Sequence, residues 1–225
     1  MRAMKRIPQR ELLDDDEGTP AEIAASLRDL QRINQWFGGV ATSEYLFRNA
    51  LRQSGLSNAE VLEVAAGDGY CVRATAETLR REGFNLQVTG LDRKASHMRD
   101  HVGMQAVVGD ALNLPFPERS FDFVSSCLFL HHLSPVDAVR SINEALRVCR
   151  YGVLINDIDR KAIHLGLVYL GLPLFRSRIT WNDGPASVRQ AYTAAELADL
   201  IKKTLAIRFD VTNRYLYRIA ATIWK

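Results

Sequence analysis

A strand that turns through two glycines into a helix decides the fold of this chain, and it reads Val61-Leu62-Glu63-Val64-Ala65-Ala66-Gly67-Asp68-Gly69-Tyr70. Its first five residues are apolar except for Glu63, which is typical of a strand buried in a parallel sheet. The two glycines allow the backbone to approach a ligand closely. The stretch therefore predicts a ligand site at the point where the strand ends.

The charge of this stretch indicates what kind of ligand it binds. A dinucleotide-binding turn, with its G-x-G-x-x-G pattern, would need Gly or Ala at the position of Val72. Pyrophosphate also binds to bare backbone N–H groups at such a helix terminus, whereas Glu63 and Asp68 place carboxylates close to it. These carboxylates would repel a phosphate and attract a cation. The stretch therefore favours a cationic ligand.

Short apolar runs alternate with helical stretches from residue 59 to residue 158, which is the pattern of βαβ units and of a parallel sheet. We expect helices after Gly69, Arg93 and Ser134. The ligand crevice of such a sheet lies at the carboxyl ends of its strands. The expected strands are 61–65, 86–91, 106–109, 121–125 and 153–157.

Two helices are predicted before the sheet, in an N-terminal helical cap over residues 1–56. The first begins at the capping box Thr19-Pro20-Ala21-Glu22 and ends at Gly38-Gly39. The second runs from Ser43 to Leu51. We expect both to pack against the domain that follows, residues 57–225.

The chain after the fifth strand has two further parts. Residues 160–192 form an insertion, predicted to be a helical lid, whose apolar run 163–175 is shorter than the roughly 20 residues that span a bilayer. The β-rich runs 207–211 and 215–223, separated by 212–214, predict a terminal antiparallel hairpin. The expected fold class is therefore α/β, a Rossmann-like and mostly parallel seven-stranded sheet with these additions.

Composition excludes several classes of protein. A net charge of +3 over 225 residues is too small to indicate nucleic-acid binding. Cys71, Cys127 and Cys149 are widely spaced and form no CxxC pair, so neither a disulfide framework nor a metal site is predicted. Residues 1–10 are basic but lack the apolar stretch of a signal peptide. We expect a cytoplasmic protein.

The stretch from Val61 to Tyr70 resembles motif I of the class I S-adenosylmethionine-dependent methyltransferases, in the subgroup similar to the ubiquinone and menaquinone biosynthesis enzymes. The resemblance implies that Glu63 helps to hold the methionyl amino group of S-adenosylmethionine. Gly67 and Gly69 match the family's glycines. Ala65 departs from the family, which usually has glycine there, and we count it among the cofactor contacts.

The resemblance continues along the chain and implies further cofactor contacts. Asp92, followed by Arg93, matches the acid that takes both ribose hydroxyls, as a carboxylate can. Asp110 and Ala111 match the acidic side chain and the backbone N–H that meet adenine. In the fourth-strand motif, backbone carbonyls near Cys127 face the cofactor amine. A buried thiol is the more favoured interpretation of Cys127 itself, because nothing nearby in the sequence suggests thiolate activation.

The paired histidines His131 and His132 have two interpretations. One is that a histidine anchors the start of the following helix, and the other is that it acts as a base or an acceptor ligand. The resemblance places the pair near the reaction site, and Asp157, which leaves the fifth strand, is placed to line the acceptor cavity. We name His131, His132 and Asp157 as the candidate catalytic residues.

These observations predict methyl transfer to the O or C atom of a small, apolar or phenolic acceptor. The run 163–175 is apolar on nearly every face, so it packs in the core, lines an acceptor pocket or contacts a membrane surface. The rivals are an RNA or protein methyltransferase, a binding module that only retains the fold, and an NAD-dependent oxidoreductase. Against a macromolecular substrate, residues 126–129 lack the N-P-P-Y motif of amino-group methylases. No nucleic-acid partner is expected, and the sequence does not predict an oligomeric state.

Overall fold

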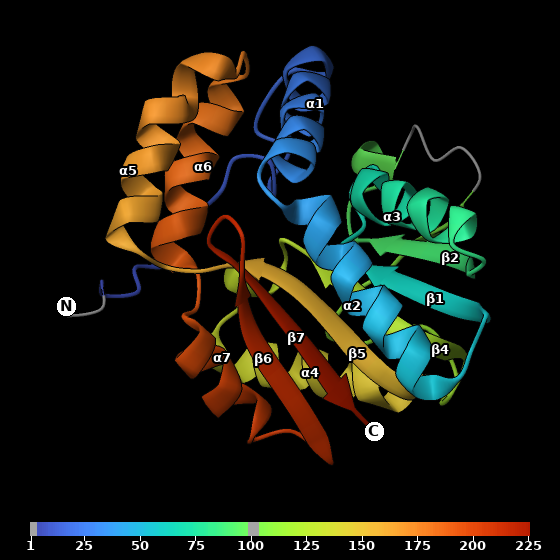
Figure 1. The fold of residues 1–225 in the computed structure, drawn as a ribbon. Coiled ribbons are helices and arrows are strands. Elements are labelled where there is room, and N and C mark those ends of the chain that lie inside the picture. The colour runs from blue at the N-terminus through green and yellow to red at the C-terminus, as the bar shows by residue number, and fades with distance from the viewer. Residues whose placement is uncertain (1–3, 99–103) are drawn as a thin grey trace.

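The computed structural model describes residues 4–98 and 104–225. Within these residues the strands form one seven-stranded sheet in the order β3-β2-β1-β4-β5-β7-β6, in which β7 runs in the direction opposite to the other strands (Figure 1). The predicted fold class and every predicted strand are confirmed. The strands are β1 (Asn58–Val64), β2 (Asn85–Asp92), β3 (Gln105–Val108), β4 (Phe121–Cys127), β5 (Cys149–Ile158), β6 (Arg208–Arg214) and β7 (Arg218–Trp224).

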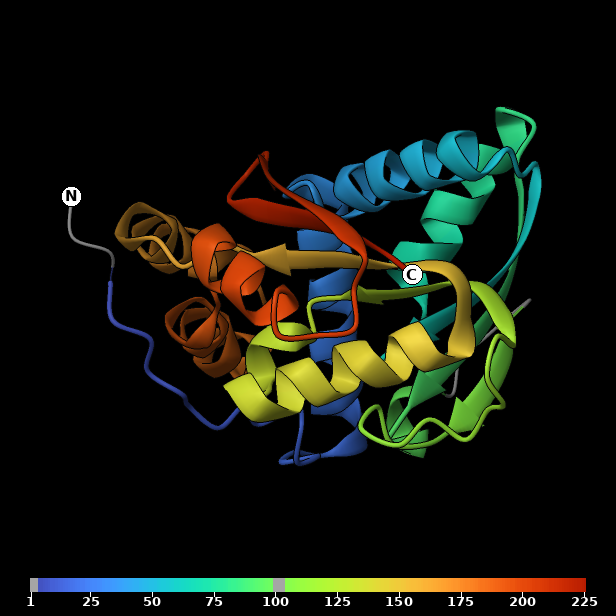
Figure 2. The ribbon, with the colours of Figure 1, turned by 90° about the horizontal axis from the view of Figure 1, so that it is seen from below.

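Helices cover both faces of the sheet (Figure 2). One face carries α2 (Gly39–Ser54) and α3 (Tyr70–Arg81), and the opposite face carries α4 (Pro135–Val148) and α7 (Ala194–Ile201). The helix α2, from the predicted cap, thus packs directly on the sheet, while the cap boundary at residue 56 stays a prediction.

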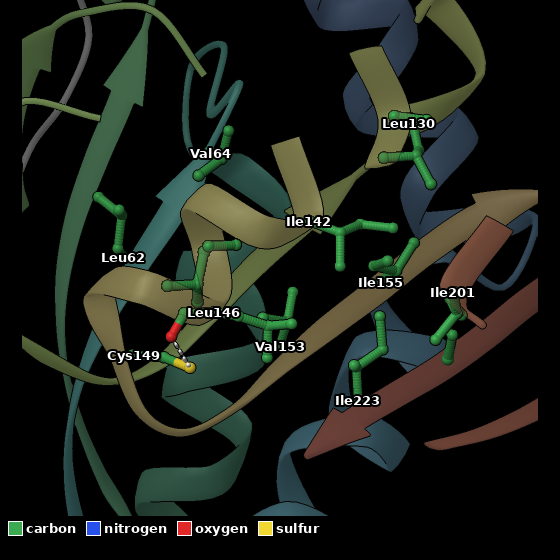
Figure 3. Close-up of a cluster of buried hydrophobic side chains, with 14 of the residues drawn as sticks. Leu62, Val64, Leu130, Ile142, Leu146, Cys149, Val153, Ile155, Ile201 and Ile223 are labelled. Atoms are coloured by element: carbon green, nitrogen blue, oxygen red, sulfur yellow. Dashed lines mark hydrogen bonds between the residues drawn. The ribbon is translucent and has the colours of Figure 1, made fainter. Parts of the chain in front are cut away.

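The apolar core lies in two layers, one on each side of the sheet, because side chains alternate along each strand. In β5, Leu154 belongs to the layer under α2 and α3, whereas Val153 and Ile155 belong to the layer under α4. Ile142 and Leu146 of α4 lie against that second layer (Figure 3). Burying each such side chain contributes about 1.5–3 kcal/mol, and together they hold the strand ends in fixed positions.

Capping side chains begin the helices where the sequence predicts them. The Ser134 Oγ accepts the backbone N–H of Asp137 at 3.1 Å, and Pro135 opens α4. Thr19 and Glu22 form the predicted capping box of α1 (Pro20–Trp36). Gly38, with φ of +75°, separates α1 from α2, which starts at Gly39, before the predicted Ser43.

Two predictions of local structure need correction. The residues 212–214 do not separate the terminal strands: they belong to β6, where Thr212 pairs with Ala220. An edge strand tolerates these polar residues because one side of it faces solvent, so the turn falls later, at 215–217. After Arg93 the described chain forms only the 3-10 turn η1 (Ala95–Met98), and residues 99–103 lie outside the described part.

The insertion forms a pair of helices beyond the carboxyl ends of the strands, beside α1 (Figure 1). They are α5 (Ala162–Gly171) and α6 (Arg178–Gln190), joined by the 3-10 turn η3 (Leu172–Leu174). No residue of α5 is buried, and Leu170 is 78% exposed. Among the described residues, the helices fall short of the length and apolar character that crossing a bilayer would require.

Candidate functional site

A cavity of about 690 Å³ opens at the carboxyl ends of β1, β2 and β4, between the sheet, α1 and the lid. Nearly all of the sequence-predicted site residues line it. These are Glu63, Ala65, Gly67, Gly69, Asp92, Arg93, Asp110, Ala111, Cys127, His131 and His132. Asp157 is the exception: it is buried behind His131 and does not reach the cavity surface.

The loop after β1 turns sharply, as its glycines predict. Gly67 and Gly69 have φ of +54° and +71°, values that suit glycine. A Cβ atom on Gly69 would lie 2.5 Å from Met104 Cε, so this glycine also provides space. Ala65 has φ of +54° in the same loop, a conformation that costs an L-residue roughly 1–2 kcal/mol. Alanine at position 65, where the family usually has glycine, therefore keeps the shape of the loop, but its backbone conformation is less favourable than that of glycine would be.

Glu63 is the buried acid of the site. It is 4% exposed, and its carboxyl group accepts hydrogen bonds from the Ser125 hydroxyl and from the backbone of Cys127. Burial in this apolar setting raises the pKa of Glu63 to about 7 despite those hydrogen bonds. In the described part of the chain, no cationic side chain forms an ion pair with it.

Asp92 ends β2 and fixes two loops at once. Its Oδ2 accepts the N–H of Gly67 at 2.9 Å, and its Oδ1 accepts the N–H of Lys94 at 2.9 Å. Each carboxylate oxygen has further acceptor capacity that faces the cavity. Asp110, after β3, is held by the N–H of Leu112 at 2.9 Å. The two acids follow neighbouring strands, so they lie along one edge of the cavity.

Cys127 is a half-buried thiol in the cavity wall. Its Sγ lies 3.5 Å from Asn34 Oδ1 of α1, and its contact with Cys71, together with burial, raises its pKa well above the ordinary value. A thiol that stays protonated is a poor nucleophile. The structure therefore supports the structural interpretation of Cys127.

His131 and Asp157 form a buried pair at the far end of the cavity. His131 is 2% exposed, and its Nδ1 donates to Asp157 Oδ1 at 2.6 Å. Asp157 Oδ2 also accepts the backbone N–H of His131 at 3.1 Å. Because a carboxylate can only accept a hydrogen bond, the Nδ1 atom of His131 carries the proton. The other ring nitrogen, Nε2, is then an acceptor that can bind a ligand. That Nε2 atom is buried and has no hydrogen bond.

His132 repeats this arrangement with a second acid. Its Nδ1 lies 2.7 Å from Asp14 Oδ2, and its ring centroid is 4.1 Å from that of His131. Glu11 lies opposite both histidines, with Oε1 3.8 Å from His131 Nε2 and Oε2 4.0 Å from His132 Nε2. Five side chains therefore form one cluster, defined here as Glu11, Asp14, His131, His132 and Asp157.

The charges of this cluster set its protonation. Burial lowers the pKa of His132, but the nearby carboxylates of Glu11 and Asp14 outweigh it and raise that pKa to about 9. Burial raises the pKa of Asp157, but the electrostatic interaction and hydrogen bond with His131 outweigh it and leave that pKa below its ordinary value. Burial raises the pKa of Glu11. The cluster therefore combines an excess of acids with two imidazoles.

Glu11 and Asp14 are cavity residues that the sequence patterns do not identify. They lie in an N-terminal segment, residues 4–18, part of which lines the cavity and which is held by Asp183 of α6. The Asp183 carboxylate accepts the N–H groups of Leu12 and Leu13 at 2.9 and 3.0 Å. The signal available was the acidic run of residues 14–17, but nothing in its spacing indicates which residues it meets.

The other wall of the cavity is apolar. It is formed by the lid, which places Leu167, Val168, Leu172 and Phe175 toward the cavity. The acids at the ends of β1 and β2 line the same cavity, which therefore has both acidic and apolar lining residues. The predicted acceptor pocket under residues 163–175 has support from this arrangement, and α5 also retains an exposed apolar face.

Comparison with known proteins agrees with this geometry. The model of a methyltransferase domain family matches residues 61–152. The demethylmenaquinone methyltransferase of Thermobifida fusca is 34% identical over 101 residues, which are 41% of this chain and 39% of that protein. The fatty-acid O-methyltransferase of Mycolicibacterium smegmatis is 30% identical over 162 residues, 65% of this chain and 54% of that protein. The chain thus spans about half or less of the length of these relatives.

A solved structure shows the same fold over nearly the whole chain. The plantazolicin methyltransferase BamL, in complex with a desmethylplantazolicin analogue and S-adenosylhomocysteine, has a TM-score of 0.71 at 14% identity. The likeness covers 95% of this chain and 93% of that one. At this identity the likeness concerns the fold, including the N-terminal helices and the lid.

Proposed function

We propose, from the premise that this chain is a class I methyltransferase domain similar to the quinone methyltransferases, that it transfers a methyl group from S-adenosylmethionine to a small acceptor. The observation that carries the proposal is Glu63, a buried carboxyl group that faces the cavity and has no cationic partner in the described chain. Burying a carboxylate is costly unless a charge pairs with it. The ammonium group of the cofactor supplies that charge.

The residues around the cavity fit this cofactor. The Asp92 carboxylate has the acceptor capacity to bind both ribose hydroxyls, while its bonds to Gly67 and Lys94 hold it in place. Asp110 and Ala111 would meet the adenine. Arg93, beside Asp92, is exposed at the cavity rim and would contact the nucleoside there. When bound, the cofactor supplies an activated methyl group on a sulfonium.

The acceptor would occupy the part of the cavity between the lid and the histidines. We assign its apolar body to the wall formed by Leu167, Val168 and Phe175, and its reacting O or C atom to the end formed by His131 and His132. Holding two reactants in line can lower the barrier by about 7–11 kcal/mol. The lid supplies this alignment and excludes water, while Asp157 holds the His131 ring in one orientation.

The exposed apolar face of α5 gives the acceptor a route from a lipid surface. Ile163 and Leu170 of α5 are 56% and 78% exposed, Leu174 of the adjoining turn η3 is 60% exposed, and α5 also lines the cavity. Peripheral membrane contact through residues 163–175 is therefore part of the proposal. We also propose a cytoplasmic location, because all three cysteines are free, and no nucleic-acid partner.

Calorimetric titration of S-adenosylmethionine into Asp92 variants tests the function. We expect Asp92→Ala to abolish measurable binding and Asp92→Asn to weaken it strongly, because the amide accepts at only one atom. Asp122→Asn is the matched control, since Asp122 lies at the opposite end of β4 and pairs with Arg150. Unchanged affinity in Asp92→Ala would refute the ribose assignment.

Activity is measured as S-adenosylhomocysteine formation with a panel of lipophilic phenols and long-chain carboxylic acids. We expect turnover with members of this panel and none with transfer RNA or histone protein. Turnover of RNA or protein alone would favour the macromolecular rival. Binding of a nicotinamide dinucleotide in place of S-adenosylmethionine would favour the oxidoreductase, and cofactor binding with no turnover of any class would favour the non-catalytic module.

A further inference from the structure

We infer that Glu11, His131 and His132 form a binding site for one divalent first-row transition-metal ion at the acceptor end of the cavity. The sequence predicts no metal, because His131 is 120 residues from Glu11 and the three residues show no ligand spacing. The chain fold brings them together. The inference that an ion binds depends only on the geometry of the cluster. A role of that ion in catalysis also rests on the proposed methyl transfer.

Three ligand atoms converge in this site. The two Nε2 atoms and a carboxylate oxygen of Glu11 all lie within 4.8 Å of one another. Ligands held at about 2.0–2.2 Å from one tetrahedral zinc-like ion are roughly 3.3–3.6 Å apart. The His131 Nε2 to Glu11 Oε1 separation of 3.8 Å therefore closes on an ion after side-chain shifts of a few tenths of an ångström. Two imidazoles and one carboxylate are a common donor set of such ions.

Neighbouring side chains already orient these ligands. Metal-bound histidines usually donate their other ring N–H to a carboxylate, and here both do: His131 to Asp157 and His132 to Asp14. Both Nε2 atoms are thereby directed toward Glu11. The Glu11 Oε1 atom accepts from Ser187 Oγ and Gln190 Nε2, each at 2.6 Å, which fixes the carboxylate beside the two imidazoles.

Two further observations point to a bound cation. His131 is 2% exposed, and its Nε2 is aimed into the cluster without a hydrogen bond, an arrangement that buried polar atoms seldom keep. In addition, three carboxylates surround two imidazoles: Glu11 and Asp157 are buried, and the side chain of Asp14 is 46% exposed. Excess buried negative charge requires a positive partner.

The ion would have open coordination positions toward the cavity, because only three protein ligands hold it. An oxygen atom of the acceptor is a suitable ligand for such an ion, and the proposed position of the acceptor lies at this end of the cavity. The N-terminal segment would then belong to the acceptor site, since it carries Glu11.

Cobalt binding tests the site without the cofactor or an acceptor. Tag-free, full-length protein is stripped with EDTA and titrated with Co²⁺, and visible d–d absorption is recorded. We expect saturation at one Co²⁺ per chain, displacement by Zn²⁺, and no sulfur-to-cobalt charge-transfer band, because the three cysteines lie outside the cluster.

Matched variants locate the ion. Glu11→Gln and His132→Gln should each weaken Co²⁺ affinity by at least about tenfold, and Asp157→Asn by about 10–100-fold, as loss of a carboxylate that orients a ligating histidine does. His164→Gln, a cavity histidine bonded to the Asp159 carbonyl, and Asp15→Asn, which pairs with Arg10, should bind as the wild type does. Circular dichroism confirms that each variant is folded.

The inference is overturned by three results: no d–d absorption, a thiolate band, or equal Co²⁺ affinity in Glu11→Gln and wild type. Calorimetry of S-adenosylmethionine on the stripped protein is run in parallel. If Co²⁺ fails to bind while S-adenosylmethionine binds, the proposed function survives and the metal site does not. The reverse outcome keeps the metal site and removes the proposed function.

Discussion

Glu63 illustrates how a single residue can favour ligand binding at the expense of the unliganded fold. Its carboxyl group is buried without a counter-charge in the described chain, and its pKa is raised to about 7. Cofactor binding needs the ionised form, whereas the unliganded protein favours the neutral form. Two predictions follow at this scale, one for binding and one for stability.

S-adenosylmethionine affinity should depend on pH through Glu63. Above pH 7 the carboxylate is ionised and attracts the ammonium group, and below pH 7 it is increasingly neutral. The affinity of the wild type relative to Glu63→Gln should therefore fall about tenfold between pH 8 and pH 6. The ratio is used because the cofactor's own amino group titrates near this range in both proteins. A ratio that is constant in calorimetry across this range would contradict the electrostatic role of Glu63.

The stability of the unliganded protein should change with pH in the direction opposite to that of the S-adenosylmethionine affinity. The folded-state pKa of about 7 lies above the ordinary value of 4.5, so the folded protein binds the proton more tightly. The Glu63 contribution to stability is therefore full below pH 4.5 and is lost as the pH rises to 7. At pH 8, Glu63→Gln should raise the free energy of unfolding in urea by about 1–3 kcal/mol. Below about pH 4, where both the folded and the unfolded forms are protonated, the difference should nearly vanish.

The sequence predicts site residues well where they share one strand end. Glu63 and Gly67 follow from strand, turn and charge patterns, Asp92 follows from the resemblance to the methyltransferases, and all three line the cavity. Glu11 and Asp14 do not, because only tertiary packing brings them to His131 and His132. Asp157 is also predicted for the site, but the fold places it one layer behind the cavity surface, where it orients the His131 ring.

At the scale of elements, two glycines have opposite environments that the sequence does not distinguish. Gly152 lies in β5 opposite Trp224, and a Cβ atom there would stand 2.5 Å from the backbone oxygen of Ile223. Gly166 lies in α5, where a Cβ atom would meet nothing within 4 Å. The first glycine is needed for the β5–β7 pairing, whereas the second only weakens its helix.

Alanine at each position should therefore act in opposite directions. Gly152→Ala should lower the free energy of unfolding by about 1–3 kcal/mol, because the backbone of β7 must move. Gly166→Ala should raise it by about 0.5–1 kcal/mol through helix propensity. Urea unfolding followed by circular dichroism measures both. Equal effects of the two substitutions would show that the β5–β7 contact is not as tight as the structure has it.

Element boundaries follow from the sequence less well than the elements themselves. Every strand from β1 to β7 coincides with a run predicted from the sequence; burial explains the apolar runs of the inner strands, whereas the edge strands β3 and β6 are largely exposed. The sequence misplaces the hairpin turn because Thr212-Asn213-Arg214 has the composition of a turn. Those residues are tolerated at the sheet edge, and the aromatic segment 215–217 turns instead.

At the scale of the whole molecule, the N-terminal segment joins the lid to the sheet. Arg6 donates to the carbonyls of His131 and Leu133 at 3.0 and 2.9 Å, and the N–H of Ile7 donates to the carbonyl of Arg189 in α6. Asp183 holds the next turn of the segment. The acceptor end of the cavity is thus built from segments that lie far apart in the sequence.

Releasing this segment should affect the acceptor more than the cofactor. Asp183→Ala removes the partner of the Leu12 and Leu13 N–H groups, so hydrogen exchange in residues 4–18 should accelerate. The KM for the acceptor should rise several-fold, whereas the Kd for S-adenosylmethionine should stay within about twofold. Asp199→Asn, an exposed change on α7, is the control. Equal loss of cofactor affinity would show that the segment supports the whole cavity.

Ala65 and Leu128 share one feature: both adopt left-handed backbone angles, with φ of +54° and +57°, where adjacent strands β1 and β4 open into the cavity. Such angles are unfavourable for alanine and leucine, so part of the fold's stabilising free energy maintains the shape of this rim. Substitution of Ala65 or Leu128 by glycine should therefore make the protein more resistant to heat. Because such stabilisation of a site often lowers activity, a slower turnover is the cost to check for in each variant.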